Sequence, residues 1–368
     1  MEYVKRLRQL RRAMGRAGYE ALLVTHLPDI RYVSGFTGSH AVVAITPRRL
    51  VLFTDGRYSG QAREEVEAAG SGARIVIGKA ALREACELLQ GLGTASVQYD
   101  GEHVTVAELS RMQESLVGVS KAAARRFFEP ATPFPVAGLR EIKDEDELAH
   151  LEGAAQLGCR LFDAIVPHLE AGTPEREVAA ELEFFARSLG ADGMSFDTIV
   201  ASGVRSSLPH GHATGLPLPR RGFVTLDFGV ILSGYCSDMT RTVYMGRPTR
   251  EEMDAYDAVL EAQETAVAAV KAGVLAGDVD EAARAVLRRA KLAEFFTHST
   301  GHGVGMEIHE GPRLAAKQQQ ALAAGMVVTI EPGIYLPGRF GIRIEDMVVV
   351  TGDQGRVLTP STKALLRL

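Results

Sequence analysis

Four carboxylates and one histidine with the chemistry of metal ligands lie on glycine-rich or strand-like segments in the C-terminal half of the chain: Asp227, Asp238, His302, Glu331 and Glu345. Hard oxygen ligands with a single imidazole favour Mn²⁺ over a thiolate-seeking metal, with Co²⁺ and Zn²⁺ as alternatives. A single aspartate in a strand is usually a surface residue or a cap. Five such residues, with the carboxylates in two symmetric pairs, indicate a metal site instead.

The carboxylates are paired by their positions in the sequence. The midpoint between Asp227 and Asp238 lies between Leu232 and Ser233, within a Leu-Ser-Gly turn. An antiparallel hairpin of that register places them directly opposite, with their Cβ atoms roughly 4.5–5.5 Å apart. The same arithmetic pairs Glu331 with Glu345 about Gly338. Adjacent carboxylates repel one another unless a cation lies between them. We therefore predict a site that holds two divalent ions.

Length and composition are typical of a globular protein. At 368 residues the chain exceeds one typical core, so we expect two domains. The net charge of −5 gives no basic surface for nucleic acid. The first residues lack the apolar region of a signal peptide, and no apolar run reaches the roughly 18 residues of a membrane span. Three cysteines without a paired motif favour reduced thiols and a cytoplasmic setting.

Residues 1–128 form the first expected domain, a small α/β unit. It combines an apolar helix face near the N-terminus with strand-like runs and a further helix-like segment: Leu7, Leu10, Met14 and Ala17 for the face; 21–24, 41–46, 50–54, 74–77 and 96–99 for the strands; 80–90 for the helix. Residues 129–140 contain closely spaced prolines, which no helix or central strand tolerates. We expect this segment to be an interdomain linker, followed by a second domain over 141–368.

The second domain repeats itself with a period of about 105 residues. Each half contains, in order, a long helical stripe, a second helix start and a long hairpin: 148–169, 171–175 and 222–246 in the first half; 253–270, 276–280 and 326–350 in the second. Each helix start places an N-cap residue ahead of acidic first-turn residues, which suits the helix dipole. Each half thereby contributes one carboxylate pair, and we expect the two halves to face each other.

Several longer motifs surround these residues. In the C-terminal half they occur in the order IVASGVRSSLPH (199–210), LDFG (226–229), SDMTRT (237–242), HSTGHGVGMEIHEG (298–311), TIEPG (329–333) and IRIED (342–346). In the N-terminal part, DIRYVSGFTG (29–38) and TDGRY (54–58) accompany them. Together these motifs make the chain resemble the Xaa-Pro peptidases of the pita-bread metallopeptidase family, aminopeptidase P and prolidase (Xaa-Pro dipeptidase).

The resemblance implies a fold and a mechanism. The fold is a small N-terminal α/β domain followed by a pseudo-twofold pita-bread (creatinase/aminopeptidase-like) catalytic domain, of mixed α/β (α+β) class. The five ligand candidates bind two divalent ions, which acidify the water that attacks the scissile carbonyl. Glu331 relays the proton of this water. His210 and His309 stabilise the oxygen of the tetrahedral intermediate, and His298 belongs to the substrate pocket.

Four further side chains lie close to these residues in the sequence. Arg343 is two residues before Glu345 and shares its strand face, so it either pairs with a ligand carboxylate or binds the substrate. Tyr335 is expected to line the same cleft. Cys236 shares a face with Asp238 but is expected to pack as a small hydrophobe rather than to bind metal. His212 has no counterpart in the family pattern and is expected at the surface or behind the site.

The resemblance implies hydrolysis of the bond between an N-terminal residue and proline. An Xaa-Pro dipeptidase is favoured, because Arg343 is placed to bind a free carboxylate beyond proline; aminopeptidase P, acting on longer peptides, is the alternative. A methionine aminopeptidase is a further alternative, because it shares the ligand set. Such enzymes usually lack a separate first domain, so residues 1–128 argue against it. A non-catalytic peptide-binding relative or a creatine-cleaving relative would be expected to have lost ligands. The resemblance also implies a homodimer, whereas the net charge and the apolar runs described above argue against nucleic acid and membrane as partners.

Overall fold

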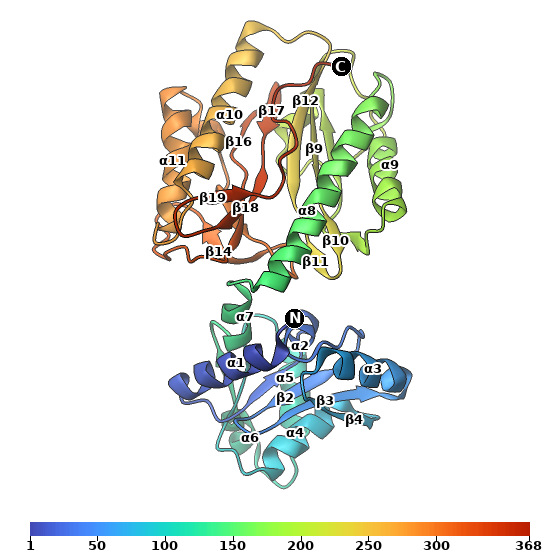
Figure 1. Ribbon diagram of the computed structural model, residues 1–368, viewed down its shortest axis with the longest axis vertical. Helices are drawn as coiled ribbons and strands as arrows, with labels where there is room; N and C mark the ends of the chain where they lie inside the picture. The colour runs from blue at the N-terminus through green and yellow to red at the C-terminus, as the bar shows by residue number, and fades with distance from the viewer. The chain divides into compact units, whose positions relative to one another are not determined.

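The computed structural model describes residues 1–368 and divides them into two compact units, Met1–Arg140 and Glu141–Leu368 (Figure 1). Each unit has buried apolar clusters of its own. None of the helices combines the length and the apolarity that crossing a membrane requires.

The first unit is a six-stranded mixed sheet with helices, in the strand order β4-β3-β2-β1-β5-β6. Its elements are α1 (Tyr3–Ala17), β1 (Leu22–Val24), α2 (Leu27–Ser34), β2 (Val42–Ile45), β3 (Leu50–Asp55), α3 (Ser59–Ala69), β4 (Arg74–Gly78), α4 (Ala81–Gly91), β5 (Val97–Asp100), α5 (Val106–Glu114), α6 (Lys121–Phe127), β6 (Phe128–Ala131) and α7 (Pro135–Arg140). The strands expected from the sequence are present, whereas helices α2, α3, α5 and α6 were not anticipated.

Residues 129–140 belong to the first unit rather than to a separate linker. Strand β6 pairs in parallel with β5, and helix α7 follows it. Pro130 is compatible with this strand because β6 lies at the edge of the sheet, where one row of backbone groups needs no partner strand. The proline-rich composition therefore marks an edge strand and a short helix.

The second unit repeats one order of elements. Its first half contains α8 (Glu145–Ile165), α9 (Glu175–Ser188), β7 (Gly193–Met194), β8 (Ile199–Ser202), β9 (Gly222–Phe228), β10 (Val230–Leu232), β11 (Tyr235–Cys236) and β12 (Met239–Met245). The second half contains α10 (Arg250–Ala269), α11 (Ala276–Arg289), β13 (Gly301–Gly303), β14 (Glu310–Leu314), β15 (Val327–Ile330), β16 (Gly333–Leu336), β17 (Phe340–Arg343), β18 (Asp346–Val350) and β19 (Gly355–Val357).

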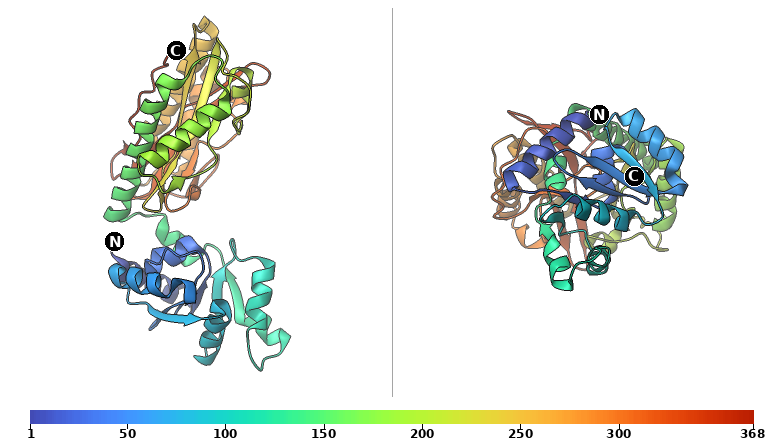
Figure 2. Two further views of the ribbon diagram at one scale, coloured as in Figure 1. Left: turned by 90° about the vertical axis from the view of Figure 1, so that its right-hand side faces the viewer. Right: turned by 90° about the horizontal axis from the view of Figure 1, so that it is seen from below.

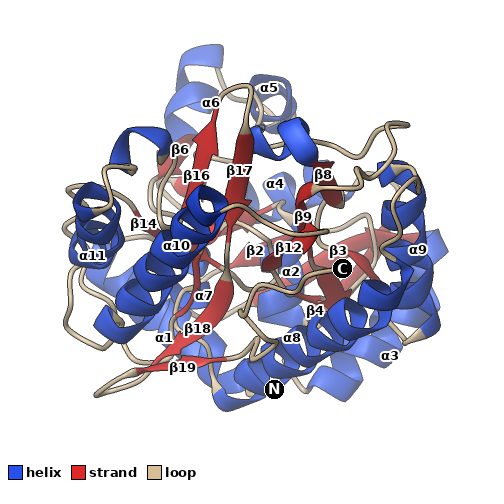
Figure 3. Ribbon diagram, turned by 90° about the horizontal axis from the view of Figure 1, so that it is seen from above, coloured by secondary structure: helices blue, strands red, loops and turns tan.

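Sheet pairing follows the same plan in both halves. Strands β8, β9 and β12 are antiparallel neighbours in the first half, and β13, β15 and β18 are antiparallel neighbours in the second. Helices α8 and α9 lie on one side of the strands, and α10 and α11 lie on the other (Figures 1 and 3). Figure 2 shows the strands running along the length of this unit. Each helix pair contributes to its own buried apolar cluster. The repeat predicted from the sequence is thus present in the fold.

Candidate active site

The first hairpin carries Asp227 and Asp238 in a register that differs from the prediction. Strand β9 pairs with β12, and Thr240 rather than Asp238 lies opposite Asp227. The turn has only two residues, because Ser233 and Gly234 both adopt positive φ angles of 51° and 74°. The predicted direct opposition of the two aspartates is therefore wrong by two positions. Strand alternation still keeps Asp238 on the face of Thr240, and both aspartates line one cavity.

The second hairpin agrees with the residue spacing. Strand β15 pairs with β18, and β16 pairs with β17, each antiparallel. Both ladders are centred on Gly338, which adopts a positive φ of 71° in the connecting loop. Glu331 and Glu345 lie between the two ladders and are therefore opposite each other, as predicted.

His302 is held with one ring nitrogen directed at the carboxylates. It lies on β13, where a Cβ on the next residue, Gly303, would collide with a backbone carbonyl of β14. The Nδ1–H of His302 donates to the carbonyl of Gly303 over 3.0 Å. Its Nε2 lies 3.6 Å from Asp238 and 3.5 Å from Glu331. Burial lowers the pKa of His302 to about 4, so the ring is neutral near pH 7 and Nε2 has a lone pair for a cation.

The carboxylates at this site are crowded and buried. Burial, and then repulsion from neighbouring carboxylates, holds the pKa values of Asp238 and Glu345 well above their usual range. Burial also raises the pKa of Glu331 to about 8. Asp227 Oδ1 is buried and accepts no hydrogen bond. Bound divalent cations would neutralise this repulsion and occupy the unused oxygen. The donor set therefore fits hard divalent ions.

Arg343 supports the site from the last hairpin. It is only 4% exposed, and its guanidinium donates to the carboxylate of Asp227, to the hydroxyl of Tyr335 at 2.6 Å and to the hydroxyl of Thr240 at 3.1 Å. Tyr335 in turn donates to Nε2 of His298 over 2.9 Å, because Nδ1 of that histidine already donates to a backbone carbonyl. Of the two roles left open for Arg343, these contacts favour support of a ligand carboxylate.

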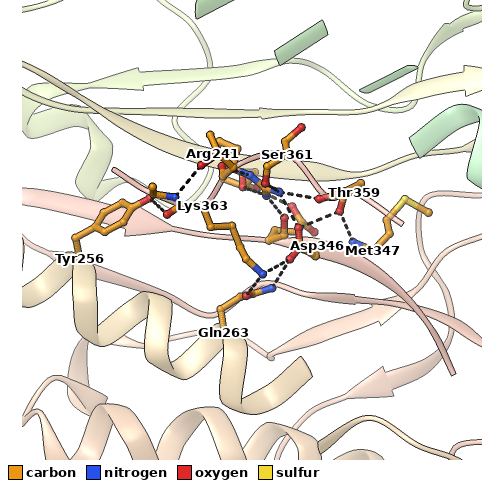
Figure 4. A network of polar contacts seen from close by, with 12 residues as sticks. Arg241, Tyr256, Gln263, Asp346, Met347, Thr359, Ser361 and Lys363 are labelled. Carbon is orange, nitrogen blue, oxygen red and sulfur yellow. Dashed lines mark hydrogen bonds and ion pairs between the residues drawn. The ribbon is translucent and has the colours of Figure 1, made fainter. Parts of the chain in front are cut away.

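A second buried network lies behind the ligands and joins the two halves (Figure 4). Asp346 is fully buried and accepts hydrogen bonds from Arg241 (2.7 Å), Thr359 (3.0 Å) and Lys363 (2.7 Å). Arg241 also donates to the backbone carbonyl of Glu345. A residue of β12 thereby holds the backbone of a ligand candidate that directly precedes β18.

One cavity of about 720 Å³ is lined by all ten residues singled out from the sequence as catalytic, substrate-binding or metal-binding. His210 and His309 are exposed on its wall. The rings of His309 and His302 have centroids 4.4 Å apart. Burial, and then the nearby His210, lowers the pKa of His309. His212 also lines the cavity and is exposed.

Two residues at the site were not anticipated. Thr240 donates to Glu345 over 2.7 Å, a contact that follows only from the two-residue turn. Arg313 lines the cavity, is exposed, and pairs in register with His302 across the β13–β14 ladder. Cys236 is buried beside the site, as expected for a small hydrophobe. This burial raises the pKa of its thiol to about 12, which disfavours the thiolate form that binds metal.

Comparison with known proteins covers both units. The model of metallopeptidase family M24 matches residues 149–352, and that of the creatinase/prolidase N-terminal domain matches residues 6–142. The chain is 38% identical over 368 residues to the uncharacterized peptidase YqhT of Bacillus subtilis. The matched region covers 99% of this chain and 100% of the relative.

Solved structures agree with the fold. An Xaa-Pro dipeptidase from Bacillus anthracis is 39% identical, with a TM-score of 0.92 over 100% of both chains. An X-Pro aminopeptidase from Thermotoga maritima is 34% identical, with a TM-score of 0.87 over 98% of this chain and 99% of the other. The predicted family resemblance and fold class are confirmed. The chain belongs to metallopeptidase family M24 and carries a creatinase/prolidase N-terminal domain.

Proposed function

We propose that this chain is an Xaa-Pro dipeptidase that uses two divalent metal ions, with Asp227, Asp238, His302, Glu331 and Glu345 as their ligands. One observation carries the proposal: the four carboxylates and the histidine line one cavity with exposed histidines and an arginine, and ligand atoms of Asp238, His302 and Glu345 lie within 4.8 Å of one another. Membership of a metallopeptidase family supports the use of divalent metal. The oxygen-rich donor set favours Mn²⁺.

When bound, the ions supply Lewis acidity, which lowers the pKa of water and polarises the scissile carbonyl. The carboxylate of Glu331 accepts a proton from the attacking water and passes it to the prolyl nitrogen, which leaves as an amine. The N–H groups of His210 and His309 donate hydrogen bonds to the oxygen of the scissile carbonyl as this oxygen gains negative charge. Arg343 and Thr240 hold Asp227 and Glu345 in place throughout.

Arg313 favours the dipeptidase over the aminopeptidase. A dipeptidase must bind the free carboxylate that follows proline directly, whereas an aminopeptidase must leave that direction open. The guanidinium of Arg343 is occupied within the protein. Arg313 is exposed in the same cavity. We assign carboxylate binding to Arg313, so the clamp role expected for Arg343 passes to a residue that the sequence did not identify.

We also propose a homodimer and a cytoplasmic setting. The first rests on resemblance to the Xaa-Pro peptidases. The second rests on the thiols, because Cys86, Cys159 and Cys236 are all free.

The experiment that tests the function is a comparison of peptide substrates with Mn²⁺ present. Ala-Pro, Ala-Pro-Ala and Ala-Ala are incubated separately with the metal-loaded protein, and kcat/KM is measured for each. We expect Ala-Pro to be cleaved fastest and Ala-Ala not to be cleaved. A preference for Ala-Pro-Ala would assign the chain to the aminopeptidases, whose Thermotoga maritima representative is also similar in structure. Cleavage of none of the three by protein that holds its metals would contradict the proposal.

A further inference from the structure

Glu175 fastens both ends of the loop that carries His210. The side chain of Glu175 is fully buried at the start of α9. Its Oε1 accepts from the backbone N–H and hydroxyl of Ser202, both at 2.8 Å. Its Oε2 accepts from the backbone N–H of Thr214 at 3.1 Å and from its hydroxyl at 2.7 Å. A single carboxylate thus closes the base of the segment 202–214.

An arginine extends this anchor toward the cavity. Arg205 donates to Glu175 over 3.1 Å and to the backbone carbonyl of His212 over 2.6 Å. Burial raises the pKa of Glu175, but the hydrogen bonds it accepts outweigh burial and hold the pKa below its ordinary value. The carboxylate is therefore ionised at neutral pH, which strengthens each of these hydrogen bonds.

Asp280 makes an equivalent arrangement in the second half. It is fully buried and accepts from the backbone N–H of Thr300 at 3.1 Å and from its hydroxyl at 2.9 Å. Arg284 donates to Asp280 over 2.7 Å and to the backbone carbonyl of His298 over 2.6 Å. Asp280 therefore fastens the segment that carries His298 and leads into strand β13.

The two acids share one position in the repeat but act on different segments. They are 105 residues apart (280 − 175), on α9 and α11, which flank the strands on opposite sides (Figures 1 and 3). The sequence predicts side-chain caps at these helix starts, but neither helix has a side-chain capping bond. Instead, Glu175 accepts hydrogen bonds from the backbone N–H and hydroxyl of Ser202 and from Arg205, all in the segment that carries His210. Asp280 accepts them from the backbone N–H and hydroxyl of Thr300, two residues after His298, and from Arg284 on its own helix.

We propose that Glu175 and Asp280 are paired positioning residues, and that each fixes one histidine of the active site: Glu175 fixes His210, and Asp280 fixes His298. This inference rests on the roles proposed above for the two histidines. A reacting group displaced by about 1 Å can lose up to about 100-fold in rate, so loosening either segment affects catalysis without contact to the substrate. Because the histidines have different roles, the two acids affect different kinetic constants.

The first test replaces Glu175 with glutamine, which keeps the shape but turns an NH₂ group toward hydrogen-bond donors. We expect Glu175→Gln to lower kcat about tenfold or more with KM and metal content nearly unchanged. Glu177→Gln is the matched control, because Glu177 is exposed in the same first turn. Should kcat stay at the wild-type value, the role of Glu175 is contradicted.

The double variant with His210→Ala distinguishes positioning from general damage. If Glu175 acts through His210, then Glu175→Gln lowers kcat much less in the His210→Ala background than in the wild type. Equal losses in both backgrounds would overturn the inference. An unaltered kcat in His210→Ala alone would instead contradict the function proposed for His210, so the two failures are separable.

The second test replaces Asp280 with asparagine. Because His298 lines the substrate cavity, we expect Asp280→Asn to raise KM about five- to tenfold while kcat changes less. The effect should largely vanish in the His298→Ala background. Asp278→Asn is the control, because Asp278 is exposed on the same helix. Additive losses, or a fall in kcat alone, would contradict the assignment.

A milder variant keeps the test decisive if the buried substitutions prevent folding. Thr214→Val removes one hydroxyl that donates to Glu175 and leaves the carboxylate intact. We expect it to lower kcat about threefold to tenfold, with the same dependence on His210. A folded Thr214→Val variant with wild-type kcat would overturn the role of the Glu175 anchor.

Discussion

Arg343 donates a hydrogen bond to the carboxylate of Asp227, so a residue of the last hairpin supports a ligand candidate of the first. The same guanidinium donates to Tyr335 and Thr240. A lysine cannot reproduce this fork of donors. The contact therefore links the two repeats at the point where each contributes candidate metal ligands.

Arg343→Lys should weaken metal binding roughly 10- to 100-fold, the usual effect of losing a residue that orients a ligand. Activity on Ala-Pro and Ala-Pro-Ala should fall by the same factor, because the metal site serves both. Metal titration followed by kinetics on both peptides measures this, with Arg339→Lys on the same hairpin as control. A loss confined to Ala-Pro would restore Arg343 as the carboxylate clamp.

Arg313→Ala should raise KM for Ala-Pro about 10- to 100-fold, as expected for a lost charge-assisted hydrogen bond. Ala-Pro amide has no carboxylate, so its KM should be the same for the variant and the wild type. Steady-state kinetics on the two substrates measures the difference. An equal rise in KM for both would show that Arg313 does not recognise the carboxylate.

His210→Ala and His309→Ala should each lower kcat roughly 10²–10³-fold, the scale of one lost donor to a developing oxyanion. Metal content should not change, because neither histidine is among the proposed ligands. Kinetics and metal analysis on the same preparations measure both quantities, with His168→Ala as an exposed control. Loss of metal in step with activity would make these histidines ligands or structural supports.

The metal-free protein should become less stable as pH rises above 7. Glu331 has a pKa of about 8 when folded, above its ordinary value of 4.5, so its protonated form favours the folded state. This contribution is complete below about pH 4.5 and is lost as pH rises through 8. Thermal unfolding in excess chelator, from pH 7 to 9, measures the slope, because His302, with a folded pKa of about 4, is neutral in both states over this range.

Glu331→Gln is the control for that slope, because it removes the titrating group. The variant should lose stability less steeply over the same range, and added Mn²⁺ should flatten the slope of the wild type. A metal-free wild type that gains stability from pH 7 to 9, or a variant with an unchanged slope, would contradict the crowding of carboxylates.

The sequence predicted the repeat, and the cavity that the candidate ligands share, better than the contacts between these residues. Glu331 and Glu345 were correctly placed because the loop around Gly338 is symmetric about that glycine. Asp227 and Asp238 were not, because Ser233 adopts a positive φ that residues with a side chain rarely take. A turn of that kind cannot be read from a Leu-Ser-Gly stretch.

The remaining differences have tertiary causes. The place of Arg313 in the cavity depends on how β14 pairs with β13. The register of that pairing shifts beside His302, so simple strand alternation does not predict which way Arg313 faces. Asp280 lies in the helix start that the sequence predicts, but its partner Thr300 comes from a different segment, so no local pattern predicts their contact. The prolines around Pro130 predict a linker, whereas Pro130 lies on an edge strand. That position depends on the strand order of the whole sheet, which the local sequence does not show.

The number of metal ions bound tests the central claim most directly. Wild-type protein, Asp238→Ala and Glu345→Ala are each stripped with chelator, loaded with Mn²⁺, desalted and analysed for metal. We expect two ions per wild-type chain and fewer than two in each variant, with loss of Ala-Pro hydrolysis. Two ions and full activity in both variants would contradict the metal site.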